Sequence, residues 1–89
     1  MSEALDVMRK RLHMRSIRRG IKEMDIILMA FSEAHLADLD EPQLQQYDAL
    51  LSENDHDLYQ WVTGQVVEPD HYTGLMAMIR EGAVGLTKP

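Results

Sequence analysis

The sequence contains no cysteine at any of its 89 positions. This absence excludes disulfide bridges, thiolate ligands for a metal and a cysteine nucleophile. Glycine (5) and proline (3) are also too sparse for a low-complexity or disordered chain, and 45% of the residues are hydrophobic. We therefore expect one packed domain over residues 1–89, stabilised by side-chain packing and helix caps, with a frayed tail at residues 83–89.

Long apolar runs are missing as well. No stretch of about 18 apolar residues occurs, which argues against a membrane-spanning helix. The chain starts with Met1-Ser2-Glu3 and has no apolar segment of signal-peptide type near this start. These features predict a protein without membrane insertion, located in the bacterial cytoplasm.

Positive charge is missing from most of the chain. No Lys or Arg occurs between Glu23 and Ile79, whereas acidic residues continue throughout that stretch. Seven of the nine basic residues come before position 23, namely Arg9, Lys10, Arg11, Arg15, Arg18, Arg19 and Lys22. Such polarisation favours a partner that meets one sign of charge, but a solvated basic face beside a solvated acidic face explains it equally well.

Apolar residues recur at helical spacing along the chain. The spacing predicts helices over 3–18, from Ile21 to near Ala34, from about 41 to Ser52, through Leu58 and Trp61 to Gly64, and from about 69 to Gly82. Only Val66-Val67 suggests a strand, so we expect an all-α fold, a compact bundle of about five short helices. Leu58 and Trp61 are expected in its core.

The helix starts carry suitable capping residues. Asp40 is the expected N-cap of the third helix, with Gln43 bonding back to it and Leu39 packing on Leu44. The acid pair Asp55 and Asp57 is likewise explained better by capping than by acid–base chemistry.

Metal and catalytic motifs are absent from this sequence. The four histidines (His13, His35, His56 and His71) lack metal-ligand spacing, so no metal site is expected. No nucleophile elbow, phosphate-binding glycine loop or dinucleotide motif occurs, so an enzymatic function has no support.

The segment from Arg18 to Asp25 is harder to explain by structure alone. Gly20 separates two helical stripes, a costly position unless it has a positive φ or lets another backbone come close. Glu23 is expected in the first turn of the second helix, where Arg18 or Arg19 can pair with it. A capped corner with a surface ion pair and a functional contact site explain this segment equally well.

Two motifs in this chain resemble those of a known family. The run Arg19-Gly20-Ile21-Lys22-Glu23-Met24-Asp25 resembles the R-G-x-x-E-x-D signature of the succinate dehydrogenase flavinylation factors, the assembly factor 2 family. The run Asp55-His56-Asp57-Leu58-Tyr59-Gln60-Trp61 resembles the second marker of that family. The likeness extends over roughly residues 9–80.

The resemblance implies a chaperone-like assembly factor rather than an enzyme. It implies that the bundle binds the flavoprotein subunit of succinate dehydrogenase, and often of fumarate reductase. We expect the chain itself to be a monomer. It further implies that the factor promotes covalent attachment of FAD to a histidine of that subunit. The chain has no flavin-binding fingerprint, so no tightly bound FAD is expected in the factor itself. On this view Arg19, Gly20 and Glu23 form an exposed contact patch, bordered by Asp25, Arg15 and Arg18.

Two other functions remain open from the sequence. The basic first helix would suit a nucleic-acid-binding or antitoxin-type regulator, since the family has also carried an antitoxin label. The acidic remainder would suit a general helical adaptor for other proteins.

Overall fold

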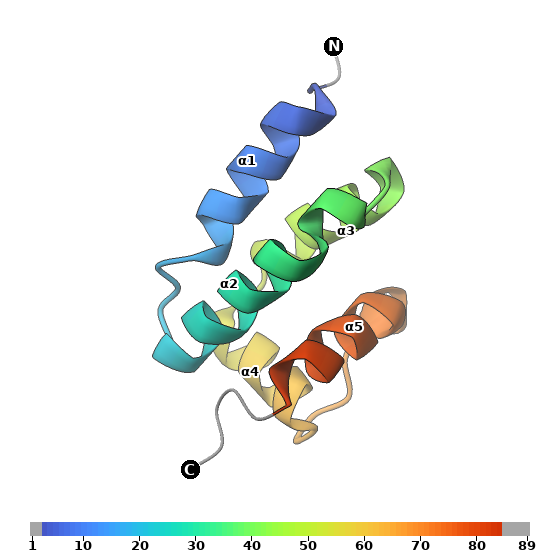
Figure 1. Ribbon diagram of the computed structural model, residues 1–89. Helices are drawn as coiled ribbons and strands as arrows, with labels where there is room; N and C mark the ends of the chain where they lie inside the picture. Colours follow the sequence, from blue (N-terminus) through green and yellow to red (C-terminus); the bar gives the residue numbers. More distant parts are fainter. Residues whose placement is uncertain (1–2, 85–89) are drawn as a thin grey trace.

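A computed structural model describes residues 3–84 of the chain, and these residues form five α-helices (Figure 1). The helices are α1 (Leu5–Ser16), α2 (Lys22–His35), α3 (Glu41–Leu51), α4 (Asp55–Thr63) and α5 (Thr73–Ala83). Two short 3-10 helices, η1 (Leu36–Asp38) and η2 (Asp70–Tyr72), lie before α3 and α5. Within residues 3–84 there is no strand, and Val67 in the one candidate segment is 83% exposed. The predicted all-α fold class is confirmed.

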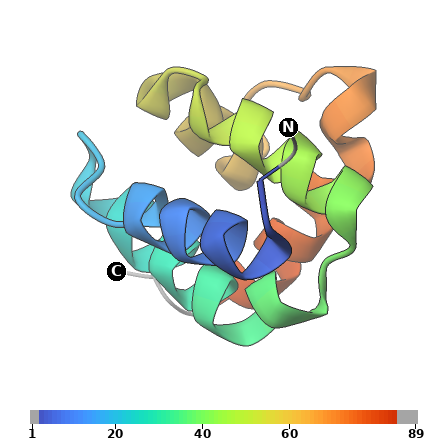
Figure 2. The same cartoon turned by 90° about the horizontal axis from the view of Figure 1, so that it is seen from above.

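Side-chain contacts define how the first three helices run. Contacts of His13 with Ser32 and of Arg9 with Leu36 make α1 and α2 antiparallel. Contacts of Arg11 with Asp48 and of Arg15 with Ser52 show that α3 runs in the same direction as α1. Figure 2 shows α1 lying along both of these helices. Helix α2 occupies the centre of the bundle, where it also contacts α4 and α5.

The core consists of the apolar stripes that the sequence shows. Leu58 and Trp61 are buried, as predicted. Three methionines, Met8, Met24 and Met76, fill the same core, because an unbranched thioether side chain adapts to irregular gaps. None of these helices is long enough to be stable alone, so their burial against one another supplies most of the stability. The fully buried large side chains include Leu12, Leu28, Phe31, Leu44, Tyr47, Leu50 and Ile79.

The first helix ends earlier than predicted. Helix α1 stops at Ser16 and not at residue 18, because the chain turns to an extended conformation at Ile17 (φ −107°, ψ 163°). The buried Ser16 hydroxyl donates to the Leu12 carbonyl at 2.7 Å, and its oxygen lies 2.6 Å from the Tyr47 hydroxyl. This contact fixes the end of α1 against α3.

The last helix starts and ends later than predicted, at Thr73 and not at about residue 69, because Asp70–Tyr72 form the 3-10 helix η2, and at Ala83 and not at Gly82. Helix α5 includes Ala83, so the tail predicted for 83–89 cannot begin before residue 84, and residues 85–89 lie outside the described part. In the last turn of α5, Arg80 donates to Glu68 (2.7 Å) and to the Trp61 carbonyl (3.1 Å), which holds the α4–α5 connection against both helices.

The predicted caps are only partly confirmed. Asp40 and Gln43 form the expected capping box, with Asp40 Oδ1 accepting from the Gln43 N–H at 2.9 Å and Gln43 Oε1 accepting from the Asp40 N–H at 3.0 Å. Gly64 ends α4 with a φ of 80°, as expected for a glycine at this position. The N-cap of α4, however, is Asn54, whose side-chain oxygen accepts from the His56 N–H at 2.8 Å. Neither Asp55 nor Asp57 is the cap.

None of the helices between residues 3 and 84 is both long enough and apolar enough to cross a bilayer.

Candidate functional site

The first motif begins in the loop between α1 and α2, residues 17–21, and continues into the first turn of α2. Its Arg19 side chain folds back onto three other parts of the chain and is only 11% exposed. Nη1 donates to the Arg15 carbonyl (3.0 Å), Nη2 to the Leu51 carbonyl (2.9 Å) and Nε to Asp55 Oδ1 (2.8 Å). Arg19 therefore links the end of α1, the end of α3 and the start of α4.

The backbone of Gly20 is held by the same carboxylate. Its N–H donates to Asp55 Oδ2 at 2.7 Å, and a Cβ built on Gly20 would lie 3.1 Å from that oxygen. Of the two reasons considered for a glycine here, a positive φ does not apply to Gly20; it occurs at Arg18, whose φ is 59°. Gly20 is thus needed for close approach, but the approaching group is a carboxylate and not a second backbone.

These contacts correct the predicted contact patch. Arg19 is not an exposed patch residue and forms its ion pair with Asp55 rather than Glu23. Asp25 accepts the backbone N–H of Arg19, so its carboxylate also supports the loop. Arg15 pairs with Asp48 and donates to the Ser52 hydroxyl at 3.0 Å.

Other residues in and next to the first motif reach the surface. Arg18, Gly20 and Lys22 are exposed and Glu23 is half-buried. Among residues 3–84, no hydrogen bond or ion pair involves the side chain of Arg18, Lys22 or Glu23. Glu23 lies in the first turn of α2, where the free backbone N–H groups favour a negative charge. We call Arg18, Gly20, Lys22 and Glu23 the exposed corner.

Several of the N-terminal arginines form ion pairs or hydrogen bonds with other parts of the bundle. Arg11 donates to Glu3 (2.9 Å) and to Asp48 (3.0 Å), and Arg15 pairs with the same Asp48. The Arg11 guanidinium, assisted by Arg15, holds the pKa of the Asp48 carboxyl below its ordinary value. Arg9 donates to the carbonyls of Leu36 (3.1 Å) and Leu39 (2.9 Å). Much of the basic face of α1 therefore connects helices.

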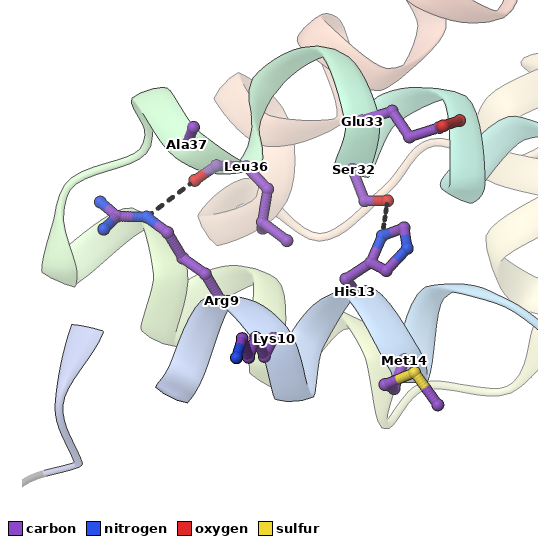
Figure 3. A pocket seen from close by; sticks show the side chains of 8 residues that line it. All are labelled: Arg9, Lys10, His13, Met14, Ser32, Glu33, Leu36 and Ala37. Atoms are coloured by element: carbon purple, nitrogen blue, oxygen red, sulfur yellow. Dashed lines mark hydrogen bonds between the residues drawn. The ribbon is translucent and has the colours of Figure 1, made fainter. Parts of the chain in front are cut away.

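A shallow groove of about 440 Å³ lies between α1 and α2 (Figure 3). Its His13 Nδ1 is 2.8 Å from the Ser32 hydroxyl, which itself donates to the Met29 carbonyl at 3.0 Å. The groove, which the sequence did not indicate, is lined by Arg9, Lys10, His13, Met14, Ser32, Glu33, Leu36 and Ala37. The described residues contain no group of three or more His, Asp or Glu that could hold a metal ion, in this groove or elsewhere.

The sequence did not reveal the role of Asp55. The acidic start of the second motif was visible, but its position suggested helix capping. Only the folded chain brings Asp55 to Arg19 and Gly20, which precede it by 36 and 35 residues.

The fold and the site describe a small helical bundle with a firmly held, charged corner between its first two helices. A family model described as the flavinator of succinate dehydrogenase matches residues 10–83, and the chain belongs to this family. The resemblance drawn from the two motifs is thereby confirmed.

Individual relatives agree with this family. The chain is 44% identical over 82 residues to a mitochondrial succinate dehydrogenase assembly factor 2 of Danio rerio, covering 89% of this chain and 52% of the relative. It is 45% identical over 62 residues to the protein of that name from Candida glabrata (70% and 40% covered). The corresponding protein of Saccharomyces cerevisiae is 44% identical over 62 residues (70% and 38% covered). The chain thus spans about half or less of the length of these relatives.

The same comparisons correct the predicted location. The relatives are named as mitochondrial proteins and come from eukaryotes, which overturns the expectation of a bacterial cytoplasmic protein.

Proposed function

We propose that this protein is an assembly factor that binds the flavoprotein subunit of succinate dehydrogenase and promotes covalent attachment of FAD to it. Membership of the flavinator family supports this proposal, as do relatives named as succinate dehydrogenase assembly factors. Binding to the related subunit of fumarate reductase is part of the same proposal.

The exposed corner is the observation that carries the proposal. Its backbone is held by Asp55 and Asp25, while the side chains of Arg18 and Glu23 make no hydrogen bond or ion pair with residues 3–84. A surface that is already ordered loses little conformational entropy when a partner binds. The corner therefore offers two positive groups, Arg18 and Lys22, beside the negative Glu23, and we assign partner contact to the side chains of Arg18 and Glu23 and to the exposed backbone of Gly20.

The mode of action that we propose requires no reacting group on the factor. By binding one conformation of the flavoprotein, the factor would hold FAD beside its acceptor histidine, and proximity alone can account for a large rate increase. On this proposal the factor is not an enzyme, does not hold FAD tightly and acts as a monomer.

Binding to a protein is favoured over binding to nucleic acid. Neutralising phosphates requires free cations, and Arg9, Arg11 and Arg15 are already engaged with carbonyls or carboxylates of the bundle. For the general adaptor hypothesis, nothing in residues 3–84 singles out a contact surface on the acidic helices.

Covalent flavin in the succinate dehydrogenase flavoprotein subunit tests the proposal. The subunit is expressed without the factor, with the wild type, or with Glu23→Ala, Arg18→Asn or Glu81→Ala, and covalent flavin fluorescence is measured on a denaturing gel. Asn is chosen at position 18 because it tolerates a left-handed backbone, and Glu81 is an exposed acid on α5.

We expect wild-type factor and Glu81→Ala to give equal fluorescence. Glu23→Ala and Arg18→Asn should lower it at low factor concentration without lowering the melting temperature. Fluorescence that does not depend on the factor would refute the proposed function, whereas loss of both fluorescence and stability would assign these residues a structural role only.

A further inference from the structure

One carboxylate joins the two motifs of this chain. Asp55 opens the second motif on α4, and its two oxygens accept hydrogen bonds from Arg19 Nε (2.8 Å) and the Gly20 N–H (2.7 Å) of the first motif. We propose that Asp55 is a positioning residue for flavoprotein binding, which acts by holding the α1–α2 loop in its binding conformation. This inference rests on the proposed function.

The contact is well placed to fix the loop. The Arg19 and Asp55 side chains are only 11% and 20% exposed, so water competes weakly for their hydrogen bonds. Hydrogen bonds between charged groups are shorter and stronger than those between neutral ones. The second oxygen of Asp55 accepts from the Gly20 N–H. This hydrogen bond restrains the peptide group between Arg19 and Gly20, shortly before the start of α2.

The loop needs such a restraint because it contains an unfavourable backbone conformation. Arg18 has a φ of 59°, which a residue with a side chain rarely adopts, and such residues persist only where their surroundings hold them. The next two N–H groups are both held by carboxylates, that of Arg19 by Asp25 and that of Gly20 by Asp55. Without Asp55, we expect the loop to populate conformations in which Arg18 and Glu23 are differently placed.

The role of Asp55 is distinct from helix capping. Asn54 already caps α4, and Asp57 in the same first turn is exposed and has no hydrogen-bond partner among residues 3–84. Asp57 therefore has the ordinary influence of a first-turn acid, without contact to the loop. This makes Asp57→Asn a matched control for Asp55→Asn, since both remove one negative charge from the same helical turn.

The experiment compares wild type, Asp55→Asn, Asp55→Ala and Asp57→Asn in two measurements on the full chain. The first is hydrogen exchange of backbone amides in the free factor. The second is the dependence of flavinylation of the succinate dehydrogenase flavoprotein subunit on factor concentration, well below the melting temperature of every variant.

For both Asp55 variants we expect faster exchange at the Gly20 amide, with core amides of α2 and α5 unchanged. If the competent loop conformation falls to about one tenth of the population, the concentration for half-maximal flavinylation rises about tenfold. The rate at saturating factor should stay at the wild-type value, because Asp55 touches no reacting group. Asp57→Asn should match the wild type in both measurements.

A double variant separates positioning from general stability. If Asp55 acts through the corner, adding Asp55→Ala to Glu23→Ala should weaken binding less than it does in the wild type. An additive loss, an equal effect of Asp57→Asn, or unchanged half-maximal concentration in a folded Asp55 variant would each overturn the inference. If Asp55→Ala does not fold, Asp55→Asn, which keeps the shape of the side chain, carries the test.

Failure of the proposed function gives a different pattern. In that case the wild type itself has no effect on flavinylation, while exchange at the Gly20 amide still reports whether Asp55 holds the loop.

Discussion

At the scale of single residues, the adjacent Arg18 and Arg19 differ in exposure and in their contacts. Arg19 is an internal link with three polar contacts, whereas Arg18, one residue earlier, is exposed. The change of direction comes from the backbone, because the left-handed conformation at Arg18 turns the following side chain back towards α3 and α4. The sequence shows two consecutive arginines and cannot distinguish them.

Gly20→Ala should destabilise the protein through one close contact. The added Cβ would lie 3.1 Å from Asp55 Oδ2, so the carboxylate must shift and its bond to the Gly20 N–H weakens. We expect a loss of about 1 kcal/mol in the free energy of unfolding, the typical net value of one hydrogen bond. Urea unfolding followed by circular dichroism measures this loss.

Gly74→Ala is the matched control. Gly74 lies in α5 with nothing within 4 Å of a built Cβ, so alanine should stabilise that helix by about 0.5–1 kcal/mol. Equal effects of the two substitutions would contradict the importance of the Asp55 contact at Gly20.

At the scale of secondary-structure elements, local rules decide where most helices begin and end. The Asp40–Gln43 capping box and the left-handed Gly64 involve residues close in sequence, which is why the pattern alone predicts them. The early end of α1 is different, since Ser16 also contacts Tyr47, which lies 31 residues away. Local propensity favours continuing that helix, and a tertiary contact ends it.

Asp40→Ala should cost about 1 kcal/mol of stability, because it leaves the N–H of Gln43 without its acceptor and removes half of the capping box. The comparison is Asp38→Ala, an exposed acid in η1 that makes no cap, which should change stability by less than about 0.5 kcal/mol. Thermal unfolding of both variants checks the difference, and similar melting temperatures would contradict the role of the cap.

At the scale of the whole molecule, the two oppositely charged parts of the sequence meet within the fold. Basic α1 lies beside α3, and Asp48 accepts from both Arg11 and Arg15. With Arg9 and Arg19, which also bind groups of the bundle, four of the seven N-terminal cations are engaged without a partner. The cations of Lys10, Arg18 and Lys22 make no hydrogen bond or ion pair with the described residues, and two of them belong to the exposed corner.

This arrangement predicts how stability depends on pH. Arg11, and then Arg15, lower the pKa of Asp48 in the folded state, so the unfolded state takes up the proton first as the pH falls. The stabilisation from Asp48 is therefore present above its ordinary pKa of about 4 and is lost as the pH falls through that value towards the lowered one. Asp48→Asn should be less stable than the wild type at neutral pH and should lose less stability on acidification.

Urea unfolding at a series of pH values between about 3 and about 7 tests this expectation. The exposed Asp57→Asn variant should keep the pH dependence of the wild type. Parallel curves for the wild type and Asp48→Asn would show that the Asp48 contacts do not depend on its charge.

The sequence by itself determined the all-α class, the approximate helices, the capping box, the buried Leu58 and Trp61, and the family. Each of these depends on residue spacing within a few helical turns or on a short motif, and such local patterns can be recognised in the sequence alone. The tertiary structure alone decided which motif residues face inwards. Arg19 and Asp55 lie 36 positions apart, and their contact depends on how α1, α3 and α4 pack. Packing over such separations leaves no local pattern in the sequence, so only the folded chain distinguishes the residues that hold the loop from those that it exposes.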